Sequence, residues 1–163
     1  MWTIFFFFEL DTDHEWLFQQ MKQNYDTKKE LVGVNHLHEV VFLGRFLRLT
    51  PHGLEWEANV KHALTLLTDF RMSRASSIGT PVTMEMVSGT TEPGVPLPGR
   101  AAKDFRAGVA RLNYLAQDRP DLGLAACVLS MKMANPTKDD LPSLKRVLRY
   151  LRGRRRVAML YQW

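Results

Sequence analysis

Residues 73–99 interrupt the chain and constrain what can form on either side of them. The segment reads SRASSIGTPVTMEMVSGTTEPGVPLPG and contains four prolines and four glycines. Proline lacks a backbone donor and glycine gains backbone freedom, so neither a helix nor a strand is expected to run through it. The sequence predicts an exposed, mobile linker here. It divides the chain into residues 1–72, a second part over 100–156 and a short segment at 157–163.

The part before the linker has the pattern of a helix, a β-hairpin and a second helix. Thr12 and Glu15 have the spacing of a capping box, and apolar residues recur at helical intervals up to residue 25. Residues 39–57 are rich in Val, Phe and Leu around a Thr-Pro-His-Gly turn, which predicts a hairpin. Asn59 is the expected N-cap of the next helix. Its inward face is predicted to comprise Val60, Ala63, Leu64, Leu67 and Phe70.

The part after the linker has the pattern of three helices and the start of a strand. The first helix covers residues 104–116, and the second begins around 118–121 with an acidic cap and proline in its first turn. The third begins near Asp139 or Asp140 and ends at Gly153. Residues 157–161 read as a strand. We therefore expect an α+β, mostly helical fold, in which the helix–hairpin–helix unit is joined by the linker to a three-helix bundle.

The net charge of +5 is distributed unevenly along the chain. Residues 1–70 hold six Lys and Arg against ten Asp and Glu, whereas residues 71–163 hold 16 against seven. The second part therefore carries a net charge of +9, which favours a polyanionic partner such as nucleic acid. A solvated helix face with a basic tail is the alternative. Seven basic residues without an acidic neighbour form the centre of this charge: Lys145, Arg146, Arg149, Arg152, Arg154, Arg155 and Arg156.

The sequence contains no complete active site and no metal-binding motif. His36 and His38 have no third ligand in range, and Cys127 is predicted to lie in the core. With one cysteine, a disulfide framework is excluded and a reducing, cytoplasmic or nuclear location is expected. The apolar start, MWTIFFFFEL, lacks the basic region and cleavage site of a secretory signal and is too short to span a membrane. We therefore expect neither secretion nor a membrane partner.

Motifs in the second part resemble the region downstream of the polymerase core in Ty1/copia-type retrotransposon reverse transcriptases. That family combines an arginine-glycine helix ending in Leu-x-Tyr-Leu-Ala with Arg-Pro-Asp, Asn-Pro and Leu-Lys-Arg-x-Leu-Arg-Tyr-Leu-x-Gly. The matching positions are Arg106, Gly108, Leu112, Tyr114, Leu115, Ala116, Arg119, Pro120, Asp121, Pro136, Leu144, Lys145, Arg146, Leu148, Arg149, Tyr150, Leu151 and Gly153. Residues 40–72, followed by Thr80-Pro81, resemble the end of the polymerase domain. The order and spacing of the motifs extend the resemblance over about residues 13–161.

The chain departs from the family pattern at the places where the chemistry is done. The Tyr-x-Asp-Asp turn that holds the catalytic metal is expected just before residue 10, where FFFFEL stands. The acidic residues of the RNase H domain are expected beyond Trp163. Leu141 and Pro142 replace the usual histidine and aromatic residue. The resemblance thus implies Mg²⁺ or Mn²⁺ for the intact polymerase, no cofactor and no catalytic residue in this chain, and an inactive protein in isolation.

The resemblance assigns nucleic-acid contacts to two places. Gly44 and Arg45 resemble the hairpin that grips the primer end, where glycine permits close approach to a phosphate. Arg106, Arg111 and Asn113 lie on the helix that resembles the first thumb helix, which contacts the sugar–phosphate backbone of the duplex. An ordinary solvated side chain is the alternative for each residue.

The implied function is to hold an RNA/DNA primer–template duplex for an RNA-directed DNA polymerase, with the remainder of the retrotransposon polyprotein as a further partner. Two alternatives stay open. One is a free-standing nucleic-acid-binding module without sequence preference. The other is a retroelement remnant without activity.

Overall fold

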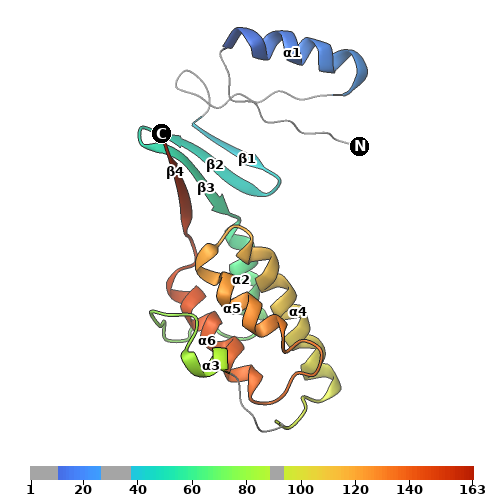
Figure 1. The fold of residues 1–163 in the computed structure, drawn as a ribbon, viewed down its shortest axis with the longest axis vertical. Coiled ribbons are helices and arrows are strands. Elements are labelled where there is room, and N and C mark those ends of the chain that lie inside the picture. The colour runs from blue at the N-terminus through green and yellow to red at the C-terminus, as the bar shows by residue number, and fades with distance from the viewer. Residues whose placement is uncertain (1–10, 27–37, 89–93) are drawn as a thin grey trace.

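The structure is a computed structural model that describes residues 11–26, 38–88 and 94–163, with side chains described from residue 15 onward in the first range. In these ranges it is a mixed α+β fold with six helices and a four-stranded antiparallel sheet (Figure 1). The predicted fold class is confirmed. The predicted capping box at Thr12 lies outside the described side chains.

The sheet has the strand order β1-β2-β3-β4. It consists of β1 (Glu39–Phe42), β2 (Arg45–Thr50), β3 (Gly53–Ala58) and β4 (Ala158–Gln162). The predicted hairpin is β2–β3, in which Thr50 pairs with Gly53 across a two-residue turn. The strand predicted near the C-terminus is β4, which returns across the whole helical part to pair with β3 (Figure 1).

A second tight turn separates β1 from β2 and was not predicted. Leu43 and Gly44 form it with φ values of 47° and 76°. Two successive positive φ angles are typical of the type I′ turn, whose twist suits an antiparallel pair. The prediction that Gly44 lies within a strand is therefore wrong. The glycine is favoured because the turn has a left-handed backbone. Crowding is not the reason, since a Cβ there would meet no atom within 4 Å.

The helices are α1 (Asp11–Asn24), α2 (Val60–Asp69), α3 (Met84–Ser88), α4 (Gly99–Ala116), α5 (Pro120–Ser130) and α6 (Asp140–Gly153). Asn59 caps α2 as predicted, because its Oδ1 accepts a hydrogen bond from the backbone N–H of Lys61 at 2.9 Å. Pro120 opens α5 as predicted. The expected acidic cap is wrong, since the cap residue is Arg119 and makes no capping hydrogen bond.

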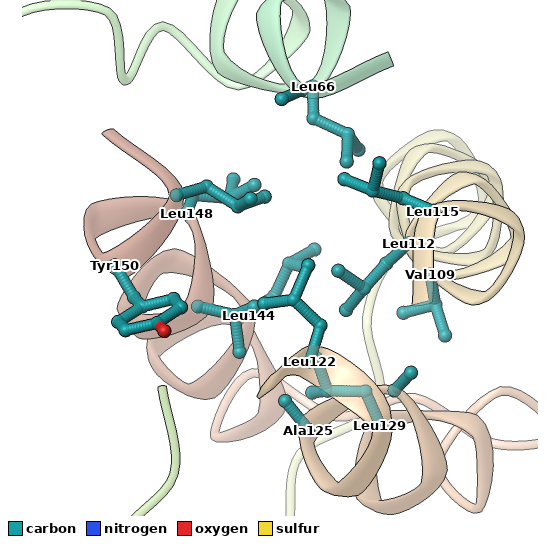
Figure 2. Close-up of a cluster of buried hydrophobic side chains, with 14 of the residues drawn as sticks. Leu66, Val109, Leu112, Leu115, Leu122, Ala125, Leu129, Leu144, Leu148 and Tyr150 are labelled. Atoms are coloured by element: carbon teal, nitrogen blue, oxygen red, sulfur yellow. The ribbon is translucent and has the colours of Figure 1, made fainter. Parts of the chain in front are cut away.

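The hydrophobic core joins four helices. Leu66 of α2, Leu112 of α4, Leu122 of α5 and Leu148 of α6 belong to one cluster, and all four side chains are fully buried (Figure 2). α2 therefore packs with the helices that follow the linker, although it precedes the linker in sequence. The predicted division of the chain at residues 72, 99 and 156 stays a prediction. The core contains residues from both sides of the first two of these boundaries.

Two predicted core positions are wrong. Leu64 is 42% exposed and Leu66 takes its place inside, because α2 presents positions 63, 66 and 67 to the other helices. Cys127 is exposed, because α5 is apolar on all sides and cannot bury its whole circumference here. By contrast, Gly108 of α4 fits the core closely. A Cβ at this position would lie 2.6 Å from the ring of Phe70.

The expected linker is, over residues 73–88, a segment without a buried side chain, as predicted, and its mobility stays a prediction. It includes α3, and Ile78, Val82 and Met86 pack against the core. Farther along, Pro96 forms an isolated β-bridge with Thr137 and Leu97 is 9% exposed. The partners of residues 73–80 lie on α6, more than 60 residues away in the sequence, so the sequence alone did not reveal these contacts.

Candidate nucleic-acid interface

Arg45, the predicted primer-grip cation, lies between the sheet and α4. Its Nε donates to the two carboxylate oxygens of Asp118 at 2.7 and 2.9 Å, and its side chain is 16% exposed. The guanidinium also lies 5.8 Å from the ring centroids of Trp56 and Tyr114. Trp56 Nε1 donates to Asp118 at 3.0 Å. Arg45 therefore links β2 to the end of α4, and only a small part of its side chain is accessible to a ligand.

Arg106 and Asn113, the predicted thumb contacts, join α4 to α5. Arg106 donates to the carbonyl oxygens of Met133 and Ala134 at 2.7 and 3.0 Å, just beyond the end of α5. The Asn113 amide donates to Ser130 Oγ at 2.7 Å and accepts from it at 3.0 Å. Arg106 thus binds carbonyl oxygens of the turn after α5, and Asn113 binds the side chain of the last residue of α5.

Arg111 makes a single ion pair, unlike Arg106 and Asn113 on the same helix, which are hydrogen-bonded to α5 and the turn after it. Its NH1 lies 3.1 Å from Asp69 Oδ2, with 38% of the arginine side chain and 55% of the aspartate side chain exposed. An exposed ion pair of this kind contributes little to stability. Arg111 can therefore exchange Asp69 for a phosphate at low cost.

Three arginines of the predicted basic run hold the segment after α2. Arg152 donates to the Ser73 carbonyl at 2.8 Å, and Arg146 donates to Thr80 Oγ1 at 3.0 Å. Arg149 donates to both the carbonyl and the hydroxyl of Ser76, each at 2.9 Å. The spacing of three residues places these arginines along one side of α6. We call them the arginine row: Arg146, Arg149 and Arg152.

The end of the basic run carries both paired and unpaired charge. Arg156 donates to the two carboxylate oxygens of Glu57 at 2.6 and 2.7 Å. Arg154 places its guanidinium 5.6 Å from the ring centroid of Tyr150. Arg155 and Lys145 are exposed, and their side chains make no hydrogen bond or ion pair with any residue in the described ranges. The run therefore does not act as one unpaired basic surface.

Glu57 is a buried acceptor that the sequence did not reveal. It is 3% exposed and accepts from Arg48 at 2.6 Å as well as from Arg156. Arg48 also pairs with Glu39 of β1. The hydrogen bond from Arg156 and then that from Arg48 outweigh the effect of burial, so the pKa of Glu57 falls to about 2. This chain of charges ties the sheet to the segment that leaves α6.

Arg119 is a second buried charge that was missed. It is 1% exposed and donates to both oxygens of Asp121 at 2.9 and 2.7 Å and to the Arg154 carbonyl at 3.0 Å. Tyr150 donates to the same carboxylate at 2.8 Å. Burial raises the pKa of Asp121, but the hydrogen bonds from Arg119 and Tyr150 outweigh it and lower the pKa. Two motifs of the resemblance, Arg-Pro-Asp and Leu-Arg-Tyr-Leu, thus meet in one network.

Unpaired cations occur at the start of α4, where the sequence analysis placed no site. Arg100 and Lys103 are exposed and have no ion pair or side-chain hydrogen bond within the described part of the chain. Helical spacing predicts that residues 100, 103, 107, 111 and 114 share one face, and all five are at least partly exposed. The spacing of Arg100, Lys103 and Arg111 is a sequence signal that could have predicted this basic face. The family motif instead drew the prediction to Arg106.

The described residues offer no donor set for a divalent metal ion. No group of three or more His, Cys, Asp or Glu side chains within residues 11–26, 38–88 and 94–163 could hold one. The metal implied for the intact polymerase therefore finds no fitting ligands in this part of the chain. None of the described helices is both long and apolar enough to cross a membrane.

Comparison with known proteins connects the chain to retroelements. It is 38% identical over 112 residues to the retrovirus-related Pol polyprotein from transposon RE2 of Arabidopsis thaliana, and 36% identical over 118 residues to that from transposon RE1. It is also 34% identical over 112 residues to an uncharacterized mitochondrial protein of the same plant. Each match covers 69% of this chain. No protein-family model matches the chain, and no solved structure matches it significantly.

The chain spans only part of these relatives. It covers 7% of each polyprotein and 45% of the mitochondrial protein. The similarity nevertheless includes more than two thirds of the residues of this chain. The chain is therefore related to a region of retrovirus-related Pol polyproteins from transposons.

Proposed function

We propose that this chain holds the primer–template duplex for a retrotransposon RNA-directed DNA polymerase whose catalytic carboxylates lie outside it. The observation that carries the proposal is the similarity to Pol polyproteins over 69% of the chain. The positive charge of the second part supports it, because phosphate contacts dominate the affinity of proteins for nucleic acid.

The contact surface is best placed on the outer face of α4. Arg100 and Lys103 have no partner there among the described residues, and Arg111 follows two turns later with an exposed partner. Tyr114 is 43% exposed on the same face. A helix with cations at this spacing can follow a backbone of regularly spaced phosphates without reading sequence. By contrast, Arg106 and Asn113 bind the end of α5 and the turn after it and so orient α4. Their proposed contribution to nucleic-acid binding is therefore indirect.

A titration with a labelled RNA–DNA hybrid at several salt concentrations tests the proposal. Each phosphate contact contributes about −0.9 to the slope of log affinity against log salt. Replacing Arg100 and Lys103 together by alanine should reduce the magnitude of this slope by about two, without creating a preference among duplex sequences.

The matched control replaces two exposed lysines elsewhere, Lys22 on α1 and Lys61 on α2. This variant removes the same charge and should leave the slope nearly unchanged. An equal loss in both variants would mean that only net charge matters, and an absence of duplex binding at low salt would refute the proposed function.

A further inference from the structure

A pocket of about 500 Å³ lies where β3 and β4 meet the end of α4. Trp56 of β3 and Tyr161 of β4 contribute to its walls, together with Trp163 directly after β4. The register of β3 and β4 explains why side chains of both strands line the pocket. Tyr161 pairs with Leu54, and Met159 pairs with Trp56, so the four side chains share one face of the sheet. Gln117, Asp118 and Gln162 complete the polar part of the lining.

The aromatic groups of this pocket are largely open to solvent. Trp163 is 73% exposed and Tyr161 is 55% exposed. Aromatic rings grouped in a hollow are typical of a binding site, because a ligand that covers them removes a large apolar area from water. The volume is in the range of small-ligand sites and is sufficient for a flat heterocycle.

The polar groups favour a neutral or anionic ligand over a cation. Asp118 is already paired with Arg45 and accepts from Trp56, so it adds no free negative charge to the pocket. Gln117 carries an amide that both donates and accepts hydrogen bonds, as the edges of nucleobases do.

Positive charge lies before the start of β4, at the other end of this strand from Trp163. The basic residues 154–156 connect α6 directly to β4. The Arg154 carbonyl accepts from Arg119, the residue after Asp118, which fixes this connection close to the pocket. Arg155 is exposed and unpaired among the described residues.

We propose that this pocket binds an unpaired nucleobase of a single-stranded nucleic acid. The base stacks on Trp163 and Tyr161, and Arg155, before the start of β4, attracts a phosphate farther along the same single strand. Sites for single strands combine aromatic stacking with a positive path for the backbone, and both are present here. The inference rests on the proposed function for its ligand class, but it assigns a surface other than the duplex-binding face of α4.

The test compares three labelled probes at one salt concentration: a single strand of about 12 nucleotides, a fully abasic strand of the same length, and a blunt RNA–DNA hybrid. Trp163→Ala should weaken binding of the single strand by about 5-fold or more, because stacking is worth about 1–3 kcal/mol per base. Affinity for the abasic strand and for the hybrid should change by less than about 2-fold, since both lack an accessible base.

Two variants keep this experiment specific. Trp163→Phe retains an aromatic face and should recover most of the affinity for the single strand. Trp16→Ala removes a tryptophan that is 67% exposed on α1, away from the pocket lining, and should have no effect. Trp163 follows the last residue of β4, so its replacement removes no strand pairing.

The outcomes separate this inference from the proposed function. Binding of the hybrid without any binding of the single strand overturns the pocket assignment alone. Failure of every probe to bind overturns both. An unchanged affinity for the single strand in Trp163→Ala, together with a shift from oligomer to monomer, would show instead that a protein segment covers these rings.

Discussion

At the scale of single residues, Glu57 has the most consequential environment. It is buried on β3 and accepts hydrogen bonds from Arg48 of β2 and from Arg156 after α6. Since its pKa falls to about 2 in the fold, the carboxylate stabilises the protein at any pH above its ordinary value near 4.5. This contribution declines as the pH drops from about 4.5 to about 2, because the unfolded chain then binds the proton more readily.

Glu57→Gln should lower the free energy of unfolding by roughly 2–3 kcal/mol at pH 7, as expected for a buried carboxylate with charged donors. The difference from the unmodified protein should shrink as the pH is lowered through 4.5 toward 2. Thermal unfolding followed by circular dichroism over this range measures it. Glu55→Gln is the control, because its contact with Arg48 is longer, at 3.7 Å, and more exposed. An equal effect of both variants would contradict the assignment.

Arg119 shows at the same scale that a residue of a family motif can serve the fold. The resemblance placed Arg-Pro-Asp beside the nucleic-acid-contacting helix, but the Arg119 guanidinium is enclosed by Asp121, Tyr150 and the Arg154 carbonyl. A buried charge must be fully hydrogen-bonded, and this network supplies the bonds. The motif therefore matches a structural requirement of the helical core.

At the scale of elements, α6 divides its basic residues between two uses. The arginine row binds the segment after α2, whereas Lys145 is exposed without a described partner. The guanidinium groups of the arginine row thus donate to carbonyl and hydroxyl oxygens of residues 73–80. From the sequence alone, these groups were predicted to bind phosphate. The row explains how a segment with little apolar surface is held against the helices.

Arg149→Ala should release this segment. Loss of two hydrogen bonds to Ser76, worth about 1 kcal/mol in total at an exposed site, should speed tryptic cleavage after Arg74 by about 5-fold. Mass spectrometry of the early fragments measures the rate. Lys145→Ala is the control and should be cleaved there like the unmodified protein, and equal rates in all three proteins would show that the arginine row does not hold the segment.

At the scale of the whole molecule, the sheet and the helices are interleaved along the chain. α2 crosses from the hairpin to the helical core, and β4 returns from α6 to the edge of β3 (Figure 1). The proposed duplex-binding face on α4 and the proposed pocket beside β4 are therefore held in a single framework. No described part of that framework supplies a metal-binding cluster of acidic residues.

We expect the purified chain to lack polymerase activity. Nucleotidyl transfer requires carboxylates that hold two metal ions near the primer end, and the described residues do not provide them. Primer extension on an RNA template with Mg²⁺ or Mn²⁺ tests this, with a mock purification to control for contaminating polymerases. Extension by the protein above the mock level would contradict the expectation.

Local sequence by itself determined most of the elements. The Asn59 cap, the turn before Gly53, Pro120 at the start of α5 and Gly153 at the end of α6 all lie where predicted. These features depend on backbone preferences and hydrogen bonds within a few residues, so they can be derived from short stretches of sequence. The inward face of α4 follows in the same way from its helical period.

Only the tertiary structure decided what the charged side chains do. Arg45 meets Asp118 across 73 residues and Arg156 meets Glu57 across 99, and no local pattern indicates either pair. Local sequence reveals that a side chain is charged, but whether its charge is paired depends on which distant backbone the fold brings within about 3 Å. For that reason the sequence predicted where most of the long helices lie, whereas only the tertiary structure showed that Arg100 and Lys103 have no partner among the described residues.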